Sequence, residues 1–197
     1  MTDAPRLTPE RLYASPSLSG STPRAVRFSP DGKRVTFLKP RAEDSARYDL
    51  WQFDVATGAQ SLLVDSAAID PADTELSEEE KALRERKRIA SVRGIADYAW
   101  GTADTIIVPA GGDIHLVTLT ANGPETRRLT QTEAFEYDAK VSPKGTHVSF
   151  IRDGALYAID LASGQETRIS PEAQPEKAIS YGVAEFVAQE EMSRYTG

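Results

Sequence analysis

Apolar and polar residues alternate in short runs along most of the chain, and turns rich in Gly or Pro separate the runs. The clearest case is residues 137–170, where four runs lie at 139–141, 147–151, 156–161 and 166–169. Alternation of this kind predicts β-strands, and the short turns between the runs predict antiparallel pairing. One such sheet cannot bury both of its faces, so further copies are expected.

The same pattern occurs twice more. The turn Ser-Pro-Asp-Gly at 29–32 repeats as Ser-Pro-Lys-Gly at 142–145, and a weaker copy starts near Tyr98. Gly101 of the weaker copy and Ser142 are 41 positions apart. Repetition at about this period is typical of successive propeller blades. The sequence therefore predicts an all-β fold, a partial β-propeller of about three four-stranded antiparallel blades with one inserted α-helix. A β-sandwich whose turns are similar by chance is the alternative.

The division expected from this pattern starts with an N-terminal segment, 1–24, that contains a short helix. The partial propeller would occupy 25–197, with blades at about 25–64, 98–131 and 137–170. Because closed propellers use about 4–8 blades, we expect a fragment of a longer propeller or one partner in a larger assembly.

A helix is expected at about 77–92, between the first two blades. Ser77 and Glu80 form a capping box, basic residues load the later turns, and Gly94 offers a stop. Its charges fit a solvated helix. They also fit a helix that points one arginine back over the propeller toward a ligand.

Composition limits the possible functions. The net charge of −7 argues against general binding of nucleic acids, whose phosphates attract basic surfaces. The chain has no cysteine, which removes disulfides and thiolate metal sites. No apolar run approaches the length of a membrane span, and the first residues do not resemble a signal sequence.

Machinery for catalysis is not visible in the sequence. The chain contains no Gly-x-Ser-x-Gly segment for a hydrolase nucleophile, and its two histidines, His115 and His147, lie on expected strands. No residues have the spacing of a zinc site or of a phosphate-binding loop. We therefore expect neither a metal nor a cofactor, and no catalytic residue within this chain.

The C-terminal residues 178–197 are expected to start the next blade, in a strand-like or turn segment. They include the adjacent carboxylates Glu190 and Glu191, which repel each other unless a cation lies between them. If the backbone turns here, both can converge on an ammonium group. The alternative is a pair of surface glutamates.

Three features together, residues 28–32, the helix at 77–93 and residues 187–192, resemble the N-terminal propeller of the dipeptidyl peptidase IV family, and most of all its bacterial branch. The resemblance implies that Glu190 and Glu191 bind the N-terminal ammonium of a peptide substrate. It also implies that an arginine of the helix lies near a substrate carbonyl, with Arg88 as first choice and Arg84 as second. Gln189 stands where the family often has an acidic residue.

The resemblance further implies a C-terminal α/β-hydrolase domain that supplies serine, aspartate and histidine, and the release of Xaa-Pro dipeptides from peptides with a free N-terminus. Whether this chain counts as an enzyme by itself is therefore left open. A homodimer and a periplasmic or extracellular location are also implied by the family. The alternative is a non-catalytic propeller that binds a protein partner and resembles the TolB type.

Overall fold

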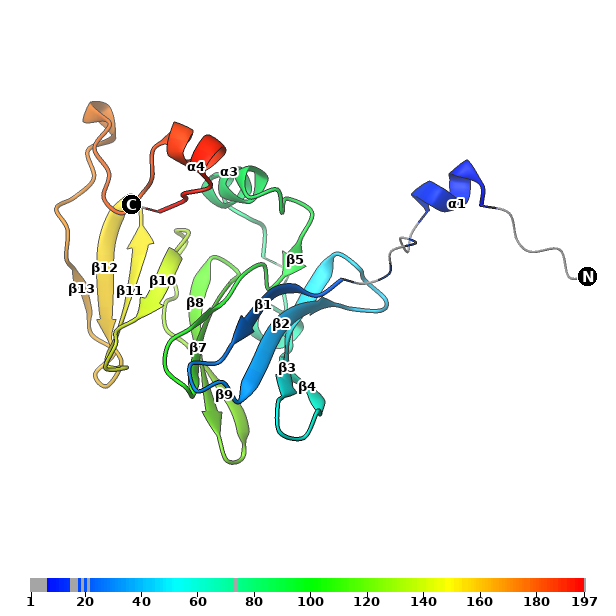
Figure 1. Ribbon diagram of the computed structural model, residues 1–197. Helices are drawn as coiled ribbons and strands as arrows, with labels where there is room; N and C mark the ends of the chain where they lie inside the picture. Colours follow the sequence, from blue (N-terminus) through cyan, green and yellow to red (C-terminus); the bar gives the residue numbers. More distant parts are fainter. Residues whose placement is uncertain (1–6, 15–17, 19, 21, 73, 197) are drawn as a thin grey trace, which may run out of the picture.

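The computed structural model describes residues 7–14, 18, 20, 22–72 and 74–196, and three antiparallel sheets follow one another along them (Figure 1). The first sheet has the order β1-β2-β3-β4, with strands Arg24–Phe28, Arg34–Pro40, Arg47–Asp54 and Gln60–Val64. The second is β6-β7-β8-β9, with strands Ala99–Trp100, Thr105–Ala110, Asp113–Thr120 and Gly123–Arg128. The third is β10-β11-β12-β13, with strands Tyr137–Val141, His147–Arg152, Ala155–Asp160 and Glu166–Arg168.

The expected fold class, three four-stranded antiparallel sheets of a partial propeller, is confirmed. One further short strand, β5 at Arg93–Gly94, pairs in parallel with β3 and makes the first sheet five-stranded. Along β1–β4, β6–β9 and β10–β13 the strands pair in chain order, so each of these pairs is joined by a local hairpin.

The repeated turn has the same chemistry in the first and third sheets. The amide of Gly32 donates to the carbonyl of Ser29 at 2.9 Å, and the amide of Gly145 donates to that of Ser142 at 2.8 Å. Both glycines have positive φ, 70° and 68°. Ser, Pro and Gly therefore occupy the positions of a type I turn that each favours, which is why the pattern could be found in the sequence.

Packing between the sheets follows the alternation of the strands. From the second sheet, Ile106 and Val108 pack against Leu38 and Leu50 of the first. The intervening Ile107 points to the other face and packs in a cluster with Phe150 of the third. The middle sheet is thus apolar on both faces, since successive strand residues point to opposite sides.

The helices are short, and each lies outside the sheets. They are α1 at Pro9–Tyr13, α2 at Ser66–Ile69, α3 at Glu78–Arg86, the 3₁₀ turn η1 at Pro175–Lys177, and α4 at Phe186–Met192. In α1, the short helix expected in the N-terminal segment, the side chain of Thr8 accepts from the amide of Arg11 at 3.2 Å and Pro9 starts the helix.

The inserted helix ends at Arg86, earlier than the expected end near residue 92. Arg88 adopts a left-handed conformation, with φ of 56°, and its amide donates to the carbonyl of Glu85. The amide of Ile89 donates to the carbonyl of Arg84, which completes a Schellman motif. Gly94, expected as the stop, belongs to β5 instead, where a Cβ would lie 2.7 Å from the carbonyl oxygen of Tyr48.

Residues 178–197 also differ from the expected strand or turn, because they contain α4. The carboxylate of Glu185 caps this helix and accepts from the amides of Val187 at 2.8 Å and Ala188 at 2.7 Å. A glutamate is not among the preferred N-cap residues, so the sequence gives little warning of the helix.

Candidate functional site

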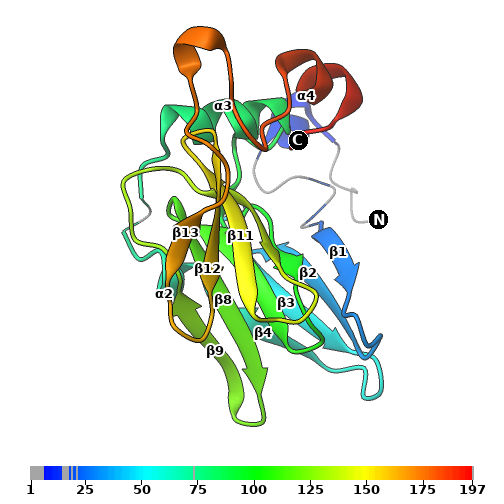
Figure 2. The same cartoon turned by 90° about the vertical axis from the view of Figure 1, so that its left-hand side faces the viewer.

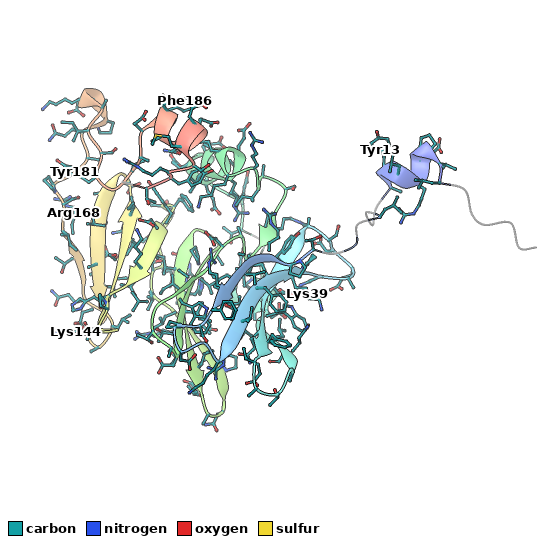
Figure 3. All side chains as sticks on the ribbon, in the orientation of Figure 1. Tyr13, Lys39, Lys144, Arg168, Tyr181 and Phe186 are labelled. Atoms are coloured by element: carbon teal, nitrogen blue, oxygen red, sulfur yellow. The ribbon has the colours of Figure 1, made fainter. Side chains whose placement is uncertain are left out.

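Helices α3 and α4 lie side by side at one end of the sheets, and the views in Figures 1 and 2 agree on this. Phe186 of α4 and Lys144, in the turn between β10 and β11, mark opposite ends of the third sheet (Figure 3). The two helices bring together the stretch around Arg86 and the stretch around Glu190, which are about 100 residues apart in the chain.

Arg84 anchors α3 and is turned inward. Its guanidinium donates to the carboxylate of Glu80 at 2.8 and 2.5 Å and to the carbonyl of Val92 at 2.6 Å. Both side chains of the ion pair are about nine-tenths buried. Arg84, the second choice for a substrate contact, is therefore already committed to holding the helix and the chain beyond it.

Arg86 is the residue of α3 that reaches α4. Its Nη1 donates to Oε1 of Gln189 at 2.9 Å, and its Nε lies 3.8 Å from Oε1 of Glu190. Its Cζ also lies 5.6 Å from the centre of the Phe186 ring. This guanidinium thus contacts three side chains of one short helix, and it sets where α4 lies relative to α3.

Gln189 joins this contact to the backbone. It is 5% exposed, and its Nε2 donates to the carbonyl of Ala184 at 2.6 Å while its Oε1 accepts from Arg86. Because the glutamine is neutral, the charge of Arg86 is balanced on α4 by Glu190 alone. Glu190 is consequently the carboxylate that a ligand cation would share with Arg86.

Glu190 and Glu191 are both exposed on α4. Adjacent residues of a helix point about 100° apart, so the two carboxylates do not face each other. A single ammonium that contacts both must lie above the outer surface of the helix, between the two side chains.

Arg88 lies one residue beyond the C-cap of α3, and it is exposed. Among the described residues of α3, the one that contacts Glu190 is Arg86, two positions before Arg88. Arg86 is not among the site residues predicted from the sequence. The signal that could have identified it is its place seven residues after Glu79, on the same face of the helix as Ala82 and Leu83.

A cavity of about 840 Å³ opens beneath α3, and Arg86 and Gln189 form part of its wall. The rings of Phe135 and Tyr137 also line it, stacked with their centres 5.2 Å apart. Burial raises the pKa of Tyr137 to about 12, so this phenol stays neutral at physiological pH. The cavity has the size and apolar lining of a ligand site.

Within residues 7–14, 18, 20, 22–72 and 74–196, no cluster of three or more His, Cys, Asp or Glu residues has the geometry of a metal site. In the same ranges, the structure contains no helix with the length and apolar character needed to cross a bilayer.

Comparison with known proteins finds a family that matches the C-terminal part of the chain. The family described as "Dipeptidyl peptidase IV (DPP IV) N-terminal region" matches residues 110–197, which include the third sheet, α4 and both glutamates. Over residues 110–197 the chain therefore matches the N-terminal region of the dipeptidyl peptidase IV family. The resemblance read from the sequence is confirmed at this level, and the bacterial branch stays a prediction.

Two curated relatives are also named dipeptidyl peptidases. Dipeptidyl peptidase 8 of Mus musculus is 33% identical over 138 residues, and Dipeptidyl peptidase 8 of Homo sapiens is 33% identical over 135 residues. Each match covers 61% of this chain and 15% of the relative. The chain thus corresponds to a small part of these dipeptidyl peptidases.

Proposed function

We propose that this chain is the substrate-selecting part of a dipeptidyl peptidase, in which Glu190 and Glu191 bind the N-terminal ammonium of the peptide. The observation that carries the proposal is the position of the two carboxylates. Both are exposed on α4, and Glu190 lies 3.8 Å from the guanidinium of Arg86, so this carboxylate already attracts a cation.

An ammonium clamp explains why such an enzyme would release dipeptides. The α-amino group has an ordinary pKa near 7.7–8.0 and is largely charged at neutral pH. If it is held at a fixed point, only the peptide bond two residues along reaches the nucleophile. That nucleophile and its base would come from a hydrolase domain, which the family resemblance implies and this chain does not supply. Catalysis needs them because a serine is a weak nucleophile without a positioned base.

Two arginines near the end of α3 are candidates for contact with a substrate carbonyl. Arg88 is the choice from the sequence, and its exposed position beyond the C-cap leaves it able to reach outward. Arg86 is the choice that the contacts add, because it already lies beside Glu190. Arg88→Ala and Arg86→Ala, measured side by side, distinguish them.

The test uses the whole protein that contains this chain and the variants Glu190→Gln and Glu191→Gln. A charge-assisted hydrogen bond is worth about 1.5–3 kcal/mol, so each variant should lose roughly 10- to 100-fold in kcat/KM on a dipeptide amide with a free N-terminus. Glutamine keeps the size of the side chain and removes only its charge. Glu176→Gln, in the exposed turn η1, is the matched control and should keep full efficiency.

An N-acetylated substrate provides the second control. It has no ammonium, so the two glutamine variants and the parent protein should hydrolyse it equally slowly. If both variants keep near-normal kcat/KM on free-amine substrates, the ammonium clamp is wrong. If the parent protein hydrolyses no peptide at all, a propeller that binds a protein partner becomes the better explanation.

A further inference from the structure

The cavity beneath α3 has features that the ammonium clamp does not use. Residues Glu79, Ala82, Leu83 and Arg86 all line it, and they lie at positions i, i+3, i+4 and i+7 of the helix. One complete face of α3 therefore borders open space. Helices in proteins normally bury such a face against other side chains, so this one is available to a ligand.

The walls of the cavity suit the apolar stem of a long side chain. Besides α3, they come from the segment between β9 and β10, from the turn between β11 and β12, and from the chain that leads to α4. Most of the residues they contribute are apolar, and the stacked pair of Phe135 and Tyr137 adds an aromatic surface. A guanidinium or ammonium group interacts favourably with the face of such rings.

The charged groups of the cavity are mainly acidic. Glu79, Glu133 and Asp153 line it from three different elements, and all three are exposed. Within the described part of the chain, none of the three forms an ion pair. The one arginine of the lining, Arg86, is already engaged by Gln189 and Glu190. A cation that enters the cavity would thus meet three carboxylates that no described cation neutralises.

We propose that this cavity binds a basic side chain, an arginine or a lysine, of a peptide. The stem of the side chain packs against Leu83 and the rings of Phe135 and Tyr137, and its charged head lies among the carboxylates at the mouth. Lysine and arginine bury their stems in this way while the head stays in a polar environment. The site uses carboxylates other than those of the ammonium clamp and needs no free N-terminus.

The experiment is calorimetric titration of the whole protein with three N-acetylated, C-amidated tripeptides. Each has two glycines, and the middle residue is arginine, norleucine or glutamate. We expect saturable binding of the arginine peptide, much weaker binding of the norleucine peptide and none of the glutamate peptide. The acetyl group prevents use of the clamp, so Glu191→Gln, which has no ion pair with the lining residue Arg86, should bind the arginine peptide as the parent protein does.

Variants of the cavity test where the peptide binds. Glu79→Gln, Glu133→Gln and Asp153→Asn should each weaken binding about two- to five-fold, as exposed ion pairs do, and the triple variant at least about ten-fold. Ala82→Phe fills the cavity from the surface of α3 and should abolish binding. Glu125→Gln, an exposed glutamate of β9 away from the cavity, is the matched control.

Two outcomes would overturn the proposal. In the first, the norleucine peptide binds as tightly as the arginine peptide, which would make the site merely apolar. In the second, the triple variant and Ala82→Phe leave the affinity for the arginine peptide unchanged, which would place binding elsewhere. Melting temperatures of all variants show whether each one is folded.

Discussion

The contacts between the sheets are made by apolar side chains. At the end of the molecule where α3 and α4 lie, the contacts are polar and a cavity is present. Phe150 is fully buried in the cluster between the second and third sheets. Phe186 of α4 is 63% exposed, and that helix contacts α3 through Arg86 and Gln189. The sheets therefore supply stability, and the helical end supplies groups that can exchange one partner for another.

The difference between apolar and polar contacts suits a binding site at the helical end. Apolar packing is dense and tolerates little movement. A guanidinium held by an amide and a nearby carboxylate can instead give up one of these contacts when a ligand offers a replacement, since exposed ion pairs are worth little. The contrast between the two regions leads to three predictions, which differ in the size of the expected effect.

The largest effect is expected from a substitution between the sheets. Phe150→Ala removes a fully buried ring that stacks on Tyr157, with ring centres 5.6 Å apart. Such truncations cost about 3–5 kcal/mol. Hydrogen exchange read by mass spectrometry should show lost protection in β11 and β12. Phe186→Ala, which truncates an exposed ring on α4, is the control and should leave protection in those strands intact.

The second prediction concerns the buried ion pair that anchors α3. Arg84→Met leaves the carboxylate of Glu80 buried without its partner, which should cost about 3 kcal/mol in local stability. Glu80→Gln should cost a similar amount. The double variant should lose less than the sum of the two, because neither charge is then left alone. Hydrogen exchange of residues 78–92 measures all three, and additive losses would contradict a coupled pair.

The sheets could be foreseen from the sequence because their signals are local. The alternation of the strands and the Ser, Pro and Gly of the turns each act within a few residues, and the turns form the hydrogen bonds that these residues favour. The N-cap at Ser77, which accepts from the amide of Glu80 at 3.1 Å, is another local signal. Such features do not depend on how distant parts of the chain meet.

The helical end was harder to predict because its determinants are not local. The Schellman motif at the end of α3 uses an arginine, Arg88, where a glycine is usual. The choice among the arginines depends on where α4 lies, and α4 begins about 100 residues later. The sequence therefore pointed to the candidate glutamates, while the contact from Arg86 required the folded structure.

The smallest effect, and the most specific, comes from a buried histidine in the middle sheet. His115 of β8 is 4% exposed, and its Nδ1 has no hydrogen-bond partner among the described residues. Burial lowers the pKa of His115, and the nearby carboxylate of Asp113 opposes this only in part. The protein therefore favours the neutral imidazole more than the unfolded chain does.

The sign of the pH dependence follows from this lowered pKa. Between the unfolded value near 6.5 and the lower folded value, the unfolded state binds more protons, so stability falls as the pH falls through this range. Denaturation midpoints measured from about pH 8 to about pH 5 should decline, and His115→Gln should remove part of the decline because glutamine does not titrate. His147→Gln, at an exposed position of β11, is the control, and its denaturation midpoint should decline with falling pH as that of the parent protein does. Equal slopes for the parent protein and His115→Gln would show that the buried imidazole does not set the acid sensitivity of the sheets.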